Sequence, residues 1–193
     1  PWVRFSQSPG EVGADAAEAV AVASGPPGAV ATLVLPADVS WSPGGVEAAP
    51  LPSRGPAPVD ADAVDAVAKA LRSGEPCGLF LGGTALREAG LVAASRVANA
   101  TGARMLAETF PARLERGQGI PGVDRRADLA EFAAHQLDGL RHLVLVDAKA
   151  PVSFFAYPGK ASYLVPDGCE VHVLAAPDGD APGALEALAE VLG

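Results

Sequence analysis

Two adjacent glycines and a threonine, Gly82-Gly83-Thr84, have the spacing most typical of a ligand-binding turn. They follow the apolar run 77–81, so they stand where a strand turns into a helix. Glycine lets a phosphate approach the backbone, and a helix N-terminus supplies free N–H donors and a positive dipole. Asp147 ends a second apolar run and could accept a hydrogen bond from a ribose hydroxyl. These four residues are the candidate cofactor-binding residues of a nucleotide cleft.

Each of these residues also has a purely structural interpretation. The glycines lack the rest of the G-x-G-x-x-G fingerprint, and a tight turn that requires positive φ also explains them. Asp147 could simply cap the next helical turn. The stretch 158–161 ends like a P-loop, but Ala161 stands where that motif needs Ser or Thr, and we therefore reject it.

No set of residues predicts catalysis or metal binding. The three histidines, His135, His142 and His172, are not spaced two to five residues apart as structural zinc ligands usually are. There is no G-x-S-x-G nucleophile elbow, and no Ser, His and Asp set stands out. The sequence therefore predicts no catalytic residue and no metal ligand in this chain.

Alternating helices and strands must position the candidate cleft. Strands are predicted at 77–81, 105–107, 142–146 and 170–174, and helices at about 60–74, 84–101, 129–139 and 184–191. Such alternation indicates parallel β-α-β units with right-handed crossovers. Residues 60–193 are therefore expected to form a doubly wound, Rossmann-like parallel sheet of the α/β class. Ligands bind beyond the carboxyl ends of such strands, which selects the loops 82–84, 108–119 and 147–159.

Apolar residues three or four positions apart predict which side of each helix faces the sheet. For the helix 84–101 these are Leu86, Ala89, Ala93, Val97 and Ala100, and for the helix that ends at Gly139 they are Leu129, Phe132, Ala133 and Leu137.

The first 59 residues divide into two parts. Residues 1–39 are predicted to form one helix, opened by a capping box of Ser8 and Glu11, and one strand. Because a lone helix and strand cannot bury their own faces, we expect them to be the end of a larger domain. Residues 40–59 carry five prolines and three glycines, which indicates a semi-rigid linker. The start at Pro1 adds to the expectation of a fragment.

Composition excludes several classes of function. The net charge of −9 opposes binding to nucleic acid. The longest apolar runs are too short to span a membrane. Two cysteines without a disulfide framework, and no visible secretory signal, lead us to expect a cytoplasmic protein.

Several stretches together resemble thiamine-diphosphate-dependent enzymes of the acetolactate synthase and benzoylformate decarboxylase family. Residues 28–39, GAVATLVLPADV, look like the G-P-V…L-x-I-P-x-D-V end of that family's pyrimidine-binding domain. Residues 70–83 look like the A-x-x-P…G-x-G entry into its central domain, and 103–110 like the second strand of that domain. Residues 157–174 are most similar to acetolactate-synthase-like members. The resemblance covers the whole chain.

The resemblance implies a domain assignment and a parent reaction. Residues 1–39 would be the C-terminal end of the pyrimidine-binding domain, 40–59 a linker, and 60–193 the non-catalytic central domain. The parent enzyme would decarboxylate a 2-oxo acid and join the product to a second oxo acid. Thiamine diphosphate and magnesium would be held by the other two domains, which would be this segment's partners within a homodimer or homotetramer.

The resemblance leaves the cofactor of the central domain open. Some members bind FAD there and carry Gly-x-Arg after the strand that matches 142–146, whereas this chain has Asp147-Ala148-Lys149-Ala150. That departure argues against FAD, and a central domain without a cofactor is our first expectation. The alternative is a free-standing FAD- or nucleotide-binding regulatory module with Gly82, Gly83 and Asp147 at its cleft.

Overall fold

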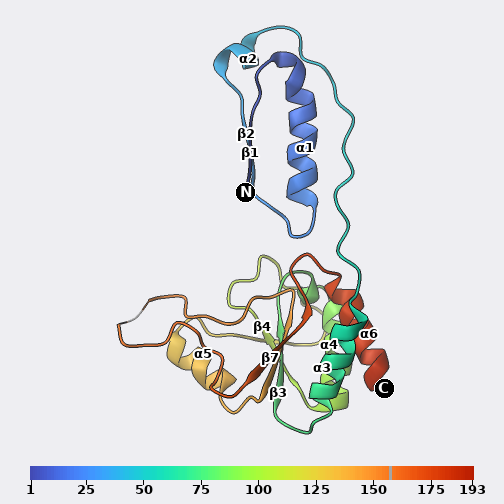
Figure 1. The fold of residues 1–193 in the computed structure, drawn as a ribbon, viewed down its shortest axis with the longest axis vertical. Coiled ribbons are helices and arrows are strands. Elements are labelled where there is room, and N and C mark those ends of the chain that lie inside the picture. The colour runs from blue at the N-terminus through green and yellow to red at the C-terminus, as the bar shows by residue number, and fades with distance from the viewer. Residues whose placement is uncertain (157) are drawn as a thin grey trace. The chain divides into compact units, whose positions relative to one another are not determined.

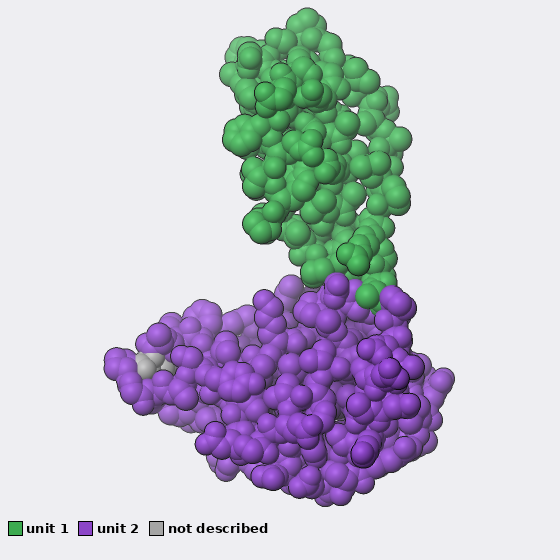
Figure 2. Space-filling view, in the orientation of Figure 1, with its two compact units in different colours: residues 1–57 green, residues 58–193 purple. Residues whose placement is uncertain are grey.

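The computed structural model describes residues 1–156 and 158–193, so Tyr157, part of one motif above, lies outside the described residues. The chain divides into two compact units, Pro1–Ala57 and Pro58–Gly193, which Figure 2 colours separately. Among the helices of the described residues, none is long and apolar enough to cross a membrane.

The first unit is a single β-α-β arrangement (Figure 1). Strands β1 (Trp2–Phe5) and β2 (Ala31–Val34) pair in parallel, and helix α1 (Val12–Ser24) lies between them in the chain. A short helix, α2 (Ala37–Trp41), follows β2. The prediction of one helix and one strand over 1–39 was therefore incomplete, because β1 and α2 are too short for a clear periodic pattern.

Polar contacts hold α1 against this small sheet. The Ser6 hydroxyl donates a hydrogen bond to Asp15 at 2.7 Å, and both residues are buried. Arg4 forms ion pairs with Asp15 at 3.4 Å and with Glu18 at 2.8 Å. Within residues 1–57, all of which the structure describes, Val39 is the one buried apolar side chain. The first unit therefore lacks a hydrophobic core of its own.

The start of α1 shows that the predicted capping box was wrong. Ser8 precedes a 3-10 turn, η1 (Pro9–Glu11), and its side chain makes no capping hydrogen bond. Glu11 accepts a hydrogen bond from the backbone nitrogen of Gln7, at 2.9 Å, rather than from Ser8. Because η1 precedes the α-helix, the helix begins at Val12. Ser8 and Glu11 therefore do not occupy the N-cap and N3 positions that a capping box requires.

Part of the predicted linker packs on the first unit. Residues 42–56 form no helix or strand. A Cβ atom at Gly13 would come within 2.3 Å of the Val46 carbonyl oxygen, so the glycine lets this stretch pass close to α1.

The second unit contains a five-stranded parallel sheet with the strand order β5-β4-β3-β6-β7. Its strands are β3 (Cys77–Leu81), β4 (Arg104–Ala107), β5 (Asp124–Arg125), β6 (His142–Val146) and β7 (Glu170–Ala175). Every residue of β3 and β6 is buried, as central parallel strands require. The predicted α/β fold with a doubly wound parallel sheet is confirmed, although β5 was not foreseen.

Helices cover both faces of this sheet (Figure 1). On one face lie α3 (Ala61–Leu71), α4 (Glu88–Thr101) and α6 (Ala181–Leu192), and α5 (Ala130–Leu137) lies on the other. The second unit has two hydrophobic cores, one on each face of the sheet, and alternate side chains of β3 pack in them. Leu79 and Leu81 pack in the first core, and Phe80 packs in the second. Asp60 caps α3, accepting hydrogen bonds from two backbone nitrogens of the first turn.

Two predicted helix faces need correction. The predicted helix 84–101 is a 3-10 turn, η2 (Gly83–Leu86), followed by α4, with extended backbone at Arg87 between them. This break changes the helical phase, so Ala89 and Ala100 are exposed and Leu91 and Ala94 are buried instead. Leu129, just before α5, is 40% exposed and Phe132 is 62% exposed, because Ala130, Ala133 and Leu137 form the buried face.

Candidate functional site

The strand order creates a switch point between β3 and β6. The chain leaves β3 toward β4 on one side and later returns to form β6 on the other, so the loops after β3 and β6 diverge. Such a point is the usual ligand crevice of an open parallel sheet. Gly82 follows β3 and Asp147 follows β6, and the structure therefore brings the predicted site residues together.

The Asp147 side chain is bound to the turn after β3. Its Oδ2 atom accepts hydrogen bonds from the Thr84 backbone nitrogen at 2.7 Å and from the Thr84 hydroxyl at 2.9 Å. Asp147 thus caps η2, a turn elsewhere in the sequence, rather than the helical turn that follows it. Its backbone has a φ of 50°, a left-handed conformation that Asp tolerates better than most residues.

The two glycines allow this close approach. A Cβ atom at Gly82 would lie 2.3 Å from the Asp147 carbonyl oxygen, and one at Gly83 would lie 2.1 Å from the Asp147 carboxylate. Gly83 also has a φ of 41°. Gly82 therefore makes room for the backbone of Asp147, and Gly83 makes room for its side chain. Of the two interpretations given above, a phosphate site and a tight turn that requires positive φ, these contacts favour the tight turn.

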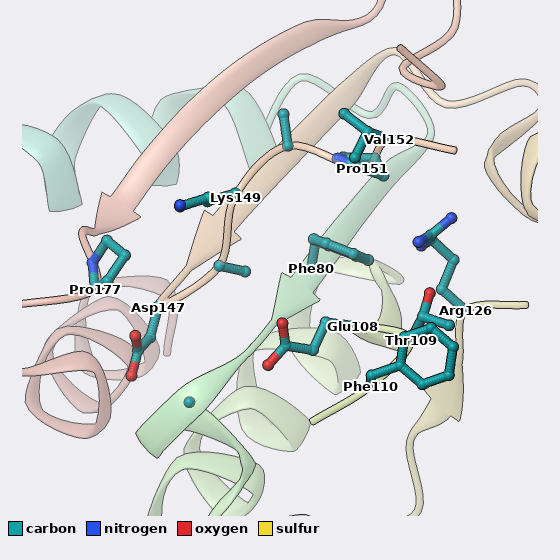
Figure 3. A pocket seen from close by; sticks show the side chains of 13 residues that line it. Phe80, Glu108, Thr109, Phe110, Arg126, Asp147, Lys149, Pro151, Val152 and Pro177 are labelled. Atoms are coloured by element: carbon teal, nitrogen blue, oxygen red, sulfur yellow. The ribbon is translucent and has the colours of Figure 1, made fainter. Parts of the chain in front are cut away.

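A cavity of about 490 Å³ opens beside this turn. Figure 3 shows the carboxyl groups of Asp147 and Glu108 and the guanidinium of Arg126 around it, with Glu108 between the other two in this view. Its lining comes from the ends of four strands and the loop after β6: Phe80, Gly83, Glu108, Thr109, Phe110, Arg126, Asp147, Ala148, Lys149, Ala150, Pro151, Val152 and Pro177.

Glu108 is a second acid at the same turn. Burial raises the pKa of its carboxyl group, a hydrogen bond from the Gly83 backbone lowers it, and the nearby charge of Asp147 raises it. Burial dominates, so the pKa of Glu108 is raised overall. Two carboxyl groups of this chain, those of Asp147 and Glu108, thus lie at this turn, and Asp147 accepts a hydrogen bond from the Thr84 backbone donor.

Arg126 presents unused donors in the cavity wall. Its residue is 7% exposed, and its Nε and Nη1 atoms have no hydrogen-bond partner in the structure. Burial lowers the pKa of Arg126, while Asp128 acts in the opposite direction. A buried guanidinium with unpaired donors is costly unless an anion or water satisfies it. The Arg126 side of the cavity therefore offers unpaired donors to an anion, whereas Lys149 lies on the other side, near Asp147 and Pro177 (Figure 3).

The loops predicted to lie at the ligand end of the sheet line this cavity, together with residues that were not predicted. The loops 108–119 and 147–159 both contribute to the cavity. Glu108, Phe110 and Arg126 were not singled out as site residues. Glu108 directly follows β4, and that position at the end of a predicted strand was an available signal. Arg126 directly follows β5, which was not predicted, so no such signal was available for it in the sequence. The prediction of no metal ligand concerns a different part of the sheet. His142 and His172 approach each other at the amino-terminal ends of β6 and β7, opposite the cavity.

Comparison with known proteins places these features in a wider context. No family model matches the sequence. The chain is 58% identical over 190 residues to "Putative acetolactate synthase large subunit IlvX" of Mycobacterium tuberculosis, covering 98% of this chain and 36% of that protein.

Solved structures with the same fold are also much longer than this chain. The structure titled "a putative thiamin diphosphate-dependent enzyme isolated from Mycobacterium smegmatis" is 22% identical, with a TM-score of 0.70, and the match covers 100% of this chain and 39% of the other. A thiamine diphosphate-dependent 4-hydroxybenzoylformate decarboxylase of Rhodococcus jostii is 19% identical, with a TM-score of 0.67, and the match covers 99% of this chain and 39% of the decarboxylase. The chain thus spans little more than a third of each relative, and it is similar in sequence to part of an acetolactate synthase large subunit and in fold to part of thiamine-diphosphate-dependent enzymes.

Proposed function

We propose that this chain supplies the central, non-catalytic domain of an acetolactate-synthase-like enzyme, together with the C-terminal end of its pyrimidine-binding domain. The boundaries would be 1–39, 40–59 and 60–193. The complete enzyme would decarboxylate a 2-oxo acid and join the product to a second oxo acid. The identity of 58% to a protein named as an acetolactate synthase large subunit supports this proposal.

The open face of the first unit is the observation that carries the proposal. Trp2 and Arg4 contact Glu18 of α1, so Val3 and Phe5, which alternate with them, point to the other face of the sheet. Val3 is 58% exposed and Phe5 is 56% exposed. Parallel strands are normally covered on both faces. This bare apolar face therefore calls for further strands or helices, and we assign it to the rest of the pyrimidine-binding domain.

The cofactors of the complete enzyme would be held outside this segment. Thiamine diphosphate supplies the carbanion-stabilising chemistry of such an enzyme, and magnesium would accompany its diphosphate. The chain has neither the activating N-terminal glutamate nor the G-D-G…N motif, since Gly179 and Asp180 lead into α6 and Asp180 caps it. What this segment contributes is domain packing and contacts within a homo-oligomer. Both cysteines are free, which fits the proposed cytoplasmic location.

A calorimetric titration of thiamine diphosphate with magnesium tests the proposal. We expect no binding heat from the 193-residue chain and clear binding by a longer chain that includes the adjoining segments. Saturable binding by the 193-residue chain would overturn the assignment of the cofactor to other domains.

FAD does not fit the turn after β3 as the sequence analysis had placed it. A pyrophosphate bound at Gly82, Gly83 and Thr84 would need the Thr84 backbone donor that Asp147 already uses. It would also lie against two carboxyl groups, which repel it when they are ionised. We therefore propose that this turn holds no dinucleotide.

The second candidate function is a nucleotide-binding regulatory module that uses the other side of the cavity. The unpaired donors of buried Arg126 favour it. Thermal unfolding with FAD, ADP and NAD separates the candidates, with Arg126→Met as the test variant and Arg104→Met, an exposed arginine at the opposite end of β4, as the matched control. A rise of several degrees with one nucleotide, lost only in Arg126→Met, would establish the module. No rise with any of them would favour the purely structural domain.

A further inference from the structure

Two histidines and a glutamate meet at the amino-terminal ends of β6 and β7, whereas the cavity lies at the carboxyl ends of the strands. His142 begins β6 and pairs in register with Glu170, the first residue of β7. His172 lies two residues further along β7, so its side chain is on the same face as that of Glu170. The Nδ1 atom of His142 is 3.1 Å from Nε2 of His172. Three side chains able to bind a metal thus converge from adjacent strands.

The distances among the three ligand atoms match a shared metal ion. Oε2 of Glu170 is 3.8 Å from Nδ1 of His142 and 4.0 Å from Nε2 of His172. With the 3.1 Å between the two nitrogens, these distances place the equidistant point in the plane of the three atoms about 2.1 Å from each, the length of a zinc–nitrogen or zinc–oxygen bond. A tetrahedral ion lies outside that plane, so the exposed Glu170 side chain would move slightly toward the histidines when it binds. The two distances to Glu170 are too long for hydrogen bonds. Hydrogen bonding accounts for the histidine pair, and the Glu170 carboxylate, which is 69% exposed, lies within ion-pair distance of both histidines when they are protonated and within reach of a metal ion that they would share when they are not.

A further carboxylate orients the first histidine. Oε2 of Glu75 is 3.0 Å from Nε2 of His142, and Arg141 lies 3.7 Å from the other oxygen of Glu75. A carboxylate in this position favours the tautomer with a proton on Nε2, which leaves the Nδ1 lone pair directed at the cluster. Histidines that bind metals almost always donate their other ring N–H in this way. His142 is 9% exposed, so its orientation is fixed by packing as well.

We propose that His142, His172 and Glu170 bind one divalent transition-metal ion of the zinc type. Imidazole and carboxylate ligands together suit zinc, cobalt, nickel or copper, whereas magnesium and calcium prefer oxygen ligands throughout. Three protein ligands leave a fourth position for water. The ion would tie the start of β6 to the start of β7. This site is independent of the proposed function, and it goes beyond the sequence analysis, which predicted no metal ligand.

A cobalt titration of the metal-free, tag-free 193-residue chain tests the site. We expect one equivalent of Co²⁺ to produce the absorption bands of a tetrahedral ion, and one equivalent of Zn²⁺ to displace it. Addition of Mg²⁺ should leave the spectrum unchanged. Absence of any cobalt spectrum, or a spectrum that shows only six-coordinate cobalt in water, would overturn the proposal.

Three variants locate the ion. His172→Ala and Glu170→Gln are expected to abolish or strongly weaken binding, and Glu75→Gln to weaken it on the order of tenfold, as loss of an orienting carboxylate does elsewhere. His135→Ala is the matched control, because it removes an exposed histidine on α5, outside the cluster. Circular dichroism confirms that each variant is folded. Unchanged affinity in His172→Ala, or an equal loss in His135→Ala, would show that the ion binds elsewhere.

Discussion

The carboxylate of Asp147 accepts hydrogen bonds from both the backbone nitrogen and the hydroxyl of Thr84, a residue 63 positions earlier in the chain. These two bonds join the loop after β6 to the turn after β3 across the switch point of the sheet. A phosphate bound there would use the same backbone donor. The Asp147 carboxylate thus occupies the backbone donor that a phosphate would use. We therefore expect its two hydrogen bonds to Thr84 to stabilise the folded domain.

Replacing Asp147 by Ala should destabilise the protein. Two charge-assisted hydrogen bonds to Thr84 are lost, and Ala is poorly suited to the left-handed backbone at this position, so we expect a loss of about 1–3 kcal/mol in the free energy of unfolding. Urea denaturation followed by circular dichroism measures it. Asp147→Asn keeps an acceptor oxygen and tolerates this backbone, and its loss should be smaller.

Asp65→Ala is the matched control for this experiment, because Asp65 is an exposed acid in the middle of α3. Its effect should stay within about 0.5 kcal/mol, as for most surface substitutions. Equal stabilities of Asp147→Ala and the unmodified protein would mean that the bonds to Thr84 contribute nothing.

A graded series of glycine substitutions separates close contact from backbone strain. In Gly83→Ala the new Cβ would meet the Asp147 carboxylate at 2.1 Å, at a φ of 41°. Gly74 has a φ of 80° and open space around it, and Gly122 has open space without positive φ. Thermal unfolding should therefore rank Gly83→Ala as the most destabilised, by about 2 kcal/mol or more, then Gly74→Ala by about 1 kcal/mol, with Gly122→Ala close to the unmodified protein. The reverse order for Gly83 and Gly74 would contradict the contact with Asp147.

The strands could be predicted because each central strand is a continuous apolar run. Cys77–Leu81 and His142–Val146 are buried on both faces, and burial on both faces requires mostly apolar residues, which can be recognised in the sequence. The break at Arg87 carries no such signal. The first backbone nitrogen of α4, at Glu88, is capped by Glu115 at 2.7 Å, from the long loop after β4. A helix start that depends on a residue 27 positions away cannot be found from local periodicity.

The candidate site shows the same limit. The four predicted residues do meet, because strand ends in a parallel sheet share an edge. Whether Asp147 would face a ligand or the protein itself depends on the strand order, and that order is a tertiary property. The approach of His142 and His172 likewise requires the pairing of β6 with β7, since the two residues are 30 positions apart.

Glu108 should make stability depend on pH in a defined direction. Because burial raises its pKa in the folded protein above the ordinary value of 4.5, the folded state binds this proton more tightly than the unfolded chain does. Its contribution to stability is fully present below pH 4.5 and is lost as the pH rises through the raised pKa. The variant Glu108→Gln cannot titrate. Unfolding free energies from pH 4 to pH 8 should show the unmodified protein losing stability relative to Glu108→Gln as the pH increases, and a constant difference would refute the raised pKa.

The two units should differ sharply in their ability to fold alone. Residues 58–193 contain both hydrophobic cores, whereas residues 1–57 bury one apolar side chain. We expect a chain of residues 58–193 to unfold cooperatively within a few degrees of the whole chain, and a chain of residues 1–57 to show little helix by circular dichroism. Deletion of α6 is the matched truncation at the other end, because Leu185 and Leu188 are fully buried in the first core, and it should prevent folding. Cooperative unfolding of residues 1–57 by themselves would show that their polar contacts suffice, and it would remove the main argument that this unit needs the missing part of a larger domain.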